Sequence, residues 1–128
     1  MGKTVLIVED EPRNLKLVRD LLNVVGYETL EATDGGKGLE LARTHKPDLI
    51  LMDIAIPVID GIEAMKILKA DAKTKNIPVI ALTAFAMKEE IENIRAAGCD
   101  GYMTKPIDTR EFLKKVAGYL SEQDMACQ

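Results

Sequence analysis

The sequence predicts an α/β fold in which helices cover both faces of one parallel sheet. Five short apolar segments alternate along the 128-residue chain with five segments of helical periodicity. Two of the apolar segments, at 4–8 and 48–53, contain unbroken aliphatic runs, which is the pattern of strands buried on both faces. Because parallel strands need crossover helices between them, this alternation indicates a doubly wound (βα)5 sheet.

The N-terminal segment predicts the first strand and the first helix. Thr4–Val8 is the strand, and it is followed by the acidic residues Glu9 and Asp10. Pro12 suits the first turn of a helix, where its missing N–H costs nothing, and Gly26 is a natural C-cap. The apolar stripe of this helix consists of Leu15, Val18, Leu21, Leu22 and Val25.

The next segments predict a second strand and helix and then the central strand. Residues 27–32 give a weaker strand signal, and Asp34 can cap a helix that stops before Pro47. The run DLILMD at 48–53 is the central strand. Ligands of open α/β sheets bind at the carboxyl ends of the strands, where a charge is also solvated. Asp53, at the end of this strand, is therefore the candidate functional residue.

The rest of the chain completes the alternation. It predicts a third helix after a loop framed by Pro57 and Gly61, a strand at 77–82 ending at Thr83, a helix at 87–97, a strand containing Tyr102 and Met103, and a last helix capped by Asp108 or Thr109. Right-handed crossovers leave few topologies, and the expected strand order is 2-1-3-4-5, with its switch point between the first and third strands. The carboxylates after these two strands are expected to converge there.

The composition indicates one cytoplasmic domain. A chain of 128 residues is too short for two ordinary domains. The formal net charge of −4, the absence of tryptophan and the lack of a basic cluster argue against nucleic-acid binding. No apolar run approaches the roughly 20 residues that span a bilayer, and the N-terminus is not a signal peptide, so no membrane contact is expected. Cys99 and Cys127 show neither a metal spacing nor a disulfide framework and are expected to be reduced.

Three converging carboxylates predict a cation site. They repel one another unless a cation joins them, and Mg²⁺ binds through one or two carboxylates while leaving room for a phosphate. Thr83 and Lys105 leave the fourth and fifth strands, so a hydroxyl and an ammonium can approach from the other side. These groups are those needed to move a phosphoryl group onto an aspartate. Pro106 can help aim Lys105 by stiffening the turn, with a cis bond as one way to do so.

These residues lie in segments that resemble the receiver domain of two-component response regulators. The matching segments are Val-Glu-Asp at 8–10, Leu-Met-Asp-Ile at 51–54 with Pro57 and Asp60-Gly61, Leu-Thr-Ala at 82–84 and Gly-Tyr-Met-Thr-Lys-Pro at 101–106. The resemblance covers essentially the whole chain and implies the CheY-like, flavodoxin-like fold, whose strand order is the one given above. We expect a receiver domain at 1–122 and a C-terminal tail at 123–128.

The resemblance implies a role for each candidate residue. Asp53 would accept a phosphoryl group from a histidine kinase or a phosphotransfer protein. The cofactor would be Mg²⁺, for which Mn²⁺ can substitute. The metal ligands would be Glu9, Asp10, Asp53 and the backbone carbonyl of Ala55. Thr83 would hydrogen-bond the phosphoryl group, and Lys105 would pair with it.

The resemblance also implies how the signal is read. Tyr102 corresponds to the switch aromatic of the family, which turns inward when Thr83 moves toward the phosphate. The surface of the fourth helix, fifth strand and fifth helix would then bind a downstream protein. The chain ends just after the fifth helix, so no effector domain is expected. Segments 83–87 and 26–30 are similar to the DivK type of single-domain regulator, which controls cell division and polarity. The alternative is a receiver detached from a hybrid-kinase phosphorelay.

Two residues are expected to slow the loss of the phosphoryl group. Ala55 lacks a polar side chain that could orient an attacking water, and Phe85 is bulky and apolar. The protein would therefore catalyse only its own phosphorylation and slow dephosphorylation, and no other enzymatic activity is expected. An aspartyl-phosphate phosphatase is a competing class, but such enzymes place a second acid where Ala55 stands. An FMN carrier lacks support, because the loop after Val8 is acidic where a phosphate cradle needs Ser, Thr and Gly.

Overall fold

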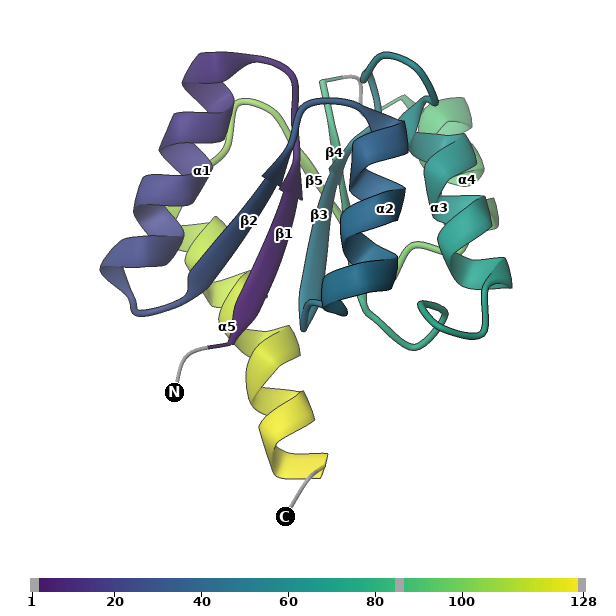
Figure 1. Ribbon diagram of the computed structural model, residues 1–128. Coiled ribbons are helices and arrows are strands. Elements are labelled where there is room, and N and C mark those ends of the chain that lie inside the picture. The colour runs from purple at the N-terminus through teal and green to yellow at the C-terminus, as the bar shows by residue number, and fades with distance from the viewer. Residues whose placement is uncertain (1–2, 85–86, 127–128) are drawn as a thin grey trace.

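The computed structural model describes residues 3–84 and 87–126, and it has the fold class and the strand order that the sequence predicts. Five parallel strands form one sheet in the order β2-β1-β3-β4-β5 (Figure 1). The strands are β1 (Thr4–Val8), β2 (Glu28–Ala32), β3 (Leu49–Asp53), β4 (Val79–Thr83) and β5 (Gly101–Thr104). The helices are α1 (Pro12–Val24), α2 (Gly35–His45), α3 (Gly61–Ala70), α4 (Lys88–Ala96) and α5 (Thr109–Ala126).

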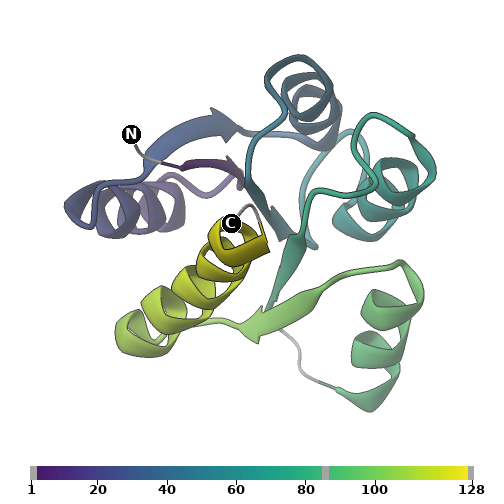
Figure 2. The same ribbon diagram turned by 90° about the horizontal axis from the view of Figure 1, so that it is seen from below.

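Helices cover both faces of the sheet, so the strands contribute to two separate cores. α1 and α5 lie on one face, and α2, α3 and α4 lie on the other (Figures 1 and 2). Alternate residues of β1, β3 and β4 point to opposite faces. The first core contains Val5, Ile7, Val18, Leu22, Leu49, Leu51, Ile80, Leu82, Phe112, Val116 and Leu120. The second contains Leu6, Val8, Leu39, Ile50, Met52, Met65, Leu68, Val79, Ala81 and Ile94.

The position of each strand in the sheet explains the strength of its sequence signal. Every residue of β3 and β4 is buried, because both strands lie in the middle of the sheet under helices on both sides. β2 lies at the edge, and Ala32 is its one buried residue. The edge position accounts for the weak, alternating pattern of residues 27–32.

Side-chain caps fix where the helices begin. Asp34 accepts a hydrogen bond from the Lys37 N–H, as predicted, and Asp60 caps α3 in the same way. At α5 the cap is Asp108, whose carboxylate accepts from the backbone N–H groups of residues 110 and 111. Asp108 rather than Thr109 is therefore the capping residue.

Several boundaries differ from the predicted ones. β4 begins at Val79 rather than Ile77, because Pro78 lacks an N–H and offers the ladder only its carbonyl, which accepts from Ile50. Val25 lies beyond the end of α1 and is 49% exposed, so it is not part of the buried stripe. Cys99 lies half-buried in the loop between α4 and β5, not in a strand.

The last helix, α5, extends to the end of the described residues. α5 continues to Ala126, so the expected boundary at residue 122 falls inside a helix. Cys127 and Phe85 lie outside the described residues. Within the parts of the chain that the structure describes, no helix has the length and apolar character needed to cross a membrane.

Candidate phosphoryl-acceptor site

The acidic residues meet because β1 and β3 are neighbours in register. Val8 lies opposite Met52, so the residues that follow them, Glu9 and Asp53, leave the sheet at the same level. Glu9 continues the ladder for one residue, because its N–H donates to the carbonyl of Ala32 at 2.9 Å. One carboxylate oxygen from each of Glu9, Asp10 and Asp53 lies within 4.8 Å of the others. The predicted convergence of three carboxylates is therefore present.

Two hydrogen bonds hold the Asp53 side chain at the carboxyl edge of the sheet. Its side chain is buried, with the residue 4% exposed. One carboxylate oxygen accepts from the Ala55 N–H at 3.0 Å, and the other accepts from the Lys105 ammonium at 2.7 Å. These two bonds fix the orientation of the carboxylate.

Lys105 joins the acidic residues across the sheet. Its ammonium also donates to the Glu9 carboxylate at 2.9 Å, so one cation is shared by two buried acids. Its backbone N–H donates to the carbonyl of Thr83 at 2.8 Å, which anchors the loop after β5 to the end of β4. The peptide bond between Lys105 and Pro106 is cis. The lysine therefore reaches Asp53, as the sequence predicts.

The electrostatics of the site centre on Glu9, which is 1% exposed. The pKa of Glu9 is raised to about 7. Burial is the largest cause and the adjacent Asp53 the next, while the hydrogen bond from the Lys105 ammonium acts in the opposite direction. Burial lowers the pKa of Lys105, but its hydrogen bonds to Asp53 and Glu9 outweigh this effect, and the net pKa is raised. Lys105 therefore stays charged, and Glu9 holds a proton over much of the neutral range. Together they relieve the repulsion expected among the three carboxylates.

Thr83 is placed beside the acceptor by the register of β3 and β4. Asp53 lies opposite Leu82, so Thr83 is one residue farther toward the carboxyl edge of the sheet. Thr83 is buried and is the last residue of β4. Thr83 therefore lies at the same edge of the sheet as Asp53.

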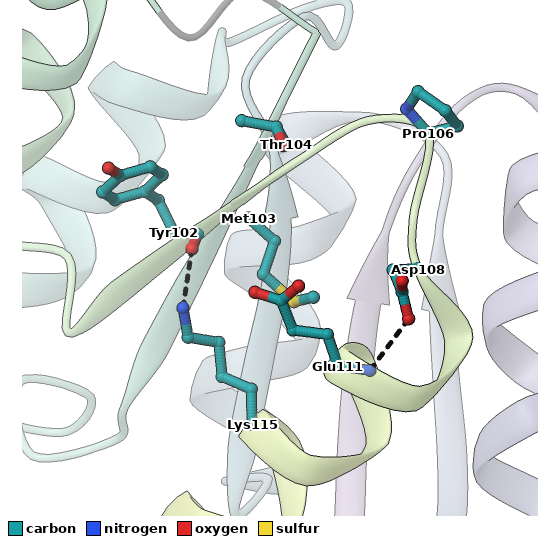
Figure 3. Close-up of a pocket in the computed structure, with 7 residues that line it drawn as sticks. All are labelled: Tyr102, Met103, Thr104, Pro106, Asp108, Glu111 and Lys115. Carbon is teal, nitrogen blue, oxygen red and sulfur yellow. Dashed lines mark hydrogen bonds between the residues drawn. The ribbon is translucent and has the colours of Figure 1, made fainter.

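Tyr102 lies on β5, on the side of the sheet that α4 covers. The ring packs against the apolar core of that face and is half-buried. Arg95 of α4 lies 5.7 Å from the ring centroid and Lys115 of α5 lies 5.9 Å from it. The Lys115 ammonium also donates to the Tyr102 carbonyl at 3.0 Å (Figure 3). Beside the ring is a cavity of about 400 Å³ between β5 and α5, lined by Glu111 and Lys115 among others.

The donor set fits a hard divalent cation. Glu9, Asp10 and Asp53 offer carboxylate oxygens, which are the ligands Mg²⁺ prefers, and Asp10 is exposed, so water can complete the coordination. The backbone N–H of Ala55 donates to the Asp53 carboxylate, and this bond fixes the start of the loop after β3. The carbonyl of Ala55 is the expected fourth protein ligand. No sulfur or histidine donor belongs to this cluster among the described residues. The donor chemistry of the site therefore suits an oxygen-bound cation such as Mg²⁺.

A family model for the response regulator receiver domain matches residues 5–117. The chain belongs to the response regulator receiver family. It is 50% identical over 122 residues to the polar-differentiation response regulator DivK of Brucella anthropi, covering 95% of this chain and 99% of that protein.

Solved receiver structures have the same fold. The receiver domain of a sensor histidine kinase from Pseudomonas aeruginosa has a magnesium ion coordinated in its active-site cleft. It matches this chain with a TM-score of 0.88 at 32% identity, covering 94% of this chain and 99% of that chain. A response regulator receiver protein from Methanospirillum hungatei matches with a TM-score of 0.88 at 31% identity, covering 98% of this chain and 99% of that chain. The fold is thus that of receiver domains.

Two features of this receiver site were not predicted from the sequence. One is the bond between Lys105 and Glu9, which are 96 residues apart and carry no local signal of their contact. The other is the conformation of the loop between β3 and α3, where Val58 has a positive φ of 72°. A β-branched residue rarely adopts such a φ, so no propensity rule points to it.

The raised pKa of Glu9 predicts that Mg²⁺ binding weakens as the pH falls. A carboxyl group must lose its proton to bind the metal. Because the pKa of Glu9 is about 7, protons compete with Mg²⁺ when the pH falls below that value. From about pH 8 to about pH 6 the apparent Mg²⁺ dissociation constant should rise roughly tenfold, because one proton is linked to binding. Isothermal titration calorimetry at both pH values measures this change.

Glu9→Gln is the control for this prediction. Glutamine cannot titrate, so the variant should bind Mg²⁺ more weakly at both pH values and lose most of the pH dependence. Equal dissociation constants for the unmodified protein at the two pH values would show that Glu9 is already ionised.

Proposed function

We propose that this receiver is a phosphorylation-dependent switch whose acceptor is Asp53 and whose phosphodonor is a histidine kinase or a phosphotransfer protein. The observation that carries the proposal is the arrangement of the Asp53 carboxylate. It is buried at the end of β3, bonded to Lys105 at 2.7 Å and adjacent to the carboxylates of Glu9 and Asp10. A buried carboxylate with a fixed orientation and a compensating cation suits nucleophilic attack on phosphorus.

In the proposed reaction a carboxylate oxygen of Asp53 attacks the phosphorus atom of the donor. A new bond forms between this oxygen and phosphorus. The P–N bond of a phosphohistidine donor breaks, and its electron pair stays on the imidazole nitrogen. The hydrogen bond from the Ala55 N–H holds one carboxylate oxygen, which leaves the other to react.

Charge on the transferred phosphoryl oxygens must be offset as the bond forms. The Lys105 ammonium donates a hydrogen bond to the reacting carboxylate and can donate instead to a phosphoryl oxygen. The Thr83 hydroxyl, at the end of β4, can donate to a second phosphoryl oxygen. Glu9, Asp10, Asp53 and the Ala55 carbonyl are the groups proposed to hold Mg²⁺. The metal would add positive charge beside the phosphoryl oxygens, and Mn²⁺, which has a similar preference for oxygen, should substitute.

The signal is proposed to leave the site through Thr83 and Tyr102. Movement of Thr83 toward a phosphoryl group vacates space that an aromatic ring on the neighbouring strand can fill, and Tyr102 lies opposite Ala81, two residues before Thr83. The affected surface consists of α4, β5 and α5, where we propose that a downstream protein binds. In this proposal the chain catalyses only its own phosphorylation and dephosphorylation.

The biological role is proposed from the relatives. The identity of 50% with the polar-differentiation regulator DivK supports a function in cell polarity and division. The partners would then be a histidine kinase or phosphotransfer protein upstream and a protein target downstream, with no role for nucleic acid or membrane.

The proposal predicts that the chain takes up one phosphoryl group from a small acyl phosphate. Incubation with Mg²⁺ and the donor should add one phosphoryl group to the intact mass, and Asp53→Asn should abolish the addition because the amide is not a nucleophile. Chelation of the metal should have the same effect. Mass spectrometry of the intact protein measures all three.

The matched control is Asp60→Asn, which makes the same change in the loop that follows Asp53. Asp60 caps α3, and asparagine caps as well as aspartate, so this variant should be phosphorylated normally. Phosphorylation that persists in Asp53→Asn, or that is lost equally in both variants, would argue against Asp53 as the acceptor.

Ala55 is predicted to prolong the phosphorylated state. The residue is exposed and lies two positions after the acceptor, so an asparagine there could orient a water molecule for attack on phosphorus. Ala55→Asn should therefore speed dephosphorylation on the order of tenfold. The decay of the phosphorylated mass after donor removal measures the rate, and an equal or slower decay in the variant would contradict the prediction.

A further inference from the structure

The loop between β3 and α3 adopts a strained turn beside the acceptor. The Ile59 N–H donates to the Pro57 carbonyl at 2.9 Å, and Val58 between them has a φ of 72°, which together define a γ-turn. Val58 is 80% exposed, so packing of its own side chain does not stabilise this conformation. The surrounding structure must therefore hold the turn in place.

One end of the loop is fixed by β4 and by the start of α3. The Ile54 N–H donates to the Leu82 carbonyl, and the Ile54 carbonyl accepts from the Gly61 N–H, each at 3.0 Å. A Cβ atom at position 61 would overlap the Asp53 carbonyl oxygen and lie 2.6 Å from the Ile54 Cα. The backbone at Ile54 and Gly61 is thus anchored, and segment 55–60 lies between these anchors.

The other contact to this segment comes from the start of α2. The Gly35 N–H donates to the Pro57 carbonyl at 3.2 Å, the same oxygen that closes the γ-turn. A Cβ atom at position 35 would overlap the Ile59 carbonyl oxygen and lie 3.0 Å from the Ile59 carbonyl carbon. Backbone atoms cannot turn aside as a flexible side chain can, so any side chain at position 35 must displace the turn.

We propose that Gly35 is a positioning residue for the metal site, although it contacts none of the acidic side chains. Because Gly35 has no side chain, the backbone of α2 contacts the γ-turn directly. This contact sets the position of segment 55–60 relative to the acidic residues, and with it the position of the Ala55 carbonyl. This inference rests on the proposed function, in which that carbonyl is a ligand. The Asp53 backbone belongs to the β3 ladder, so the turn reaches the acceptor only through the Ala55 N–H, and its main effect is on metal affinity.

Gly35→Ala tests the proposal, with Gly36→Ala as its matched control. A Cβ at position 36 meets only side-chain atoms, at 3.3 Å from Asp34 Oδ1 and 3.6 Å from Val58 Cγ1. Both variants make the same change in the first turn of α2. Calorimetry should give a Mg²⁺ dissociation constant at least about fivefold higher for Gly35→Ala and within about twofold of the unmodified protein for Gly36→Ala.

The Mg²⁺ dependence of phosphorylation separates positioning from general damage. For Gly35→Ala the half-saturating Mg²⁺ concentration should rise by the same factor, while the rate at saturating Mg²⁺ stays within about twofold. Partial unfolding would instead lower the amount of competent protein without changing the half-saturating concentration. That second pattern would overturn the proposal.

A measurement without mutation covers the case in which Gly35→Ala does not fold. Coupling between two sites is reciprocal, so if Gly35 supports metal binding, Mg²⁺ must stabilise the Gly35 contact. Hydrogen exchange of the Gly35 amide should slow at least about fivefold at saturating Mg²⁺. The Lys37 amide, which is bonded to Asp34, should change little. Unchanged exchange at Gly35 would overturn the proposal.

The outcomes also distinguish this inference from the proposed function. If the unmodified protein binds no Mg²⁺, the proposed function fails. If the unmodified protein binds Mg²⁺ and Gly35→Ala binds it equally well, the function stands and the positioning role of Gly35 fails.

Discussion

The hydrogen bonds of the Lys105 ammonium with Asp53 and Glu9 are the interaction on which the site depends. Both acids are almost fully buried, and a buried carboxylate without a partner is costly. The lysine compensates them from the loop after β5, so three strands must be in register for the acids to be tolerated. A proton on Glu9, held by its raised pKa, completes the compensation when no metal is bound. The same arrangement makes the site receptive to a divalent cation.

The two-sided core is what holds the strands in that register. A shift of one residue in β3 would exchange the residues that face α1 and α5 with those that face α2 and α3. It would also withdraw Asp53 from the edge of the sheet. The aliphatic residues of β1, β3 and β4 therefore stabilise the fold and fix the position of the acceptor at the same time. The loop after β3 is then the part of the site that needs separate support, which α2 and α3 provide through backbone contacts at Gly35 and Gly61.

The sequence predicts those parts of the structure that have a local cause. The aliphatic run of β3 and the capping residue Asp34 each specify an element within a few residues, and the strand order places Glu9, Asp10 and Asp53 at one edge. The bond between Lys105 and Glu9 and the γ-turn at Val58 depend on packing between distant segments, which local patterns do not encode. β4 begins later than predicted, because Pro78 cannot donate a hydrogen bond to the ladder.

The Lys105 ammonium stabilises the ionised form of the buried Glu9. An NMR titration of the Glu9 side-chain carboxyl carbon in metal-free protein tests this stabilisation most directly, with Lys105→Met compared with the unmodified protein. Lys114→Met, which removes a charge from an exposed residue of α5, is the control. We expect the pKa of Glu9 to rise above its value of about 7 in Lys105→Met. In Lys114→Met the pKa of Glu9 should remain at about 7. A Glu9 pKa that does not change, or that falls, when Lys105 is replaced would show that the ammonium does not stabilise the Glu9 carboxylate.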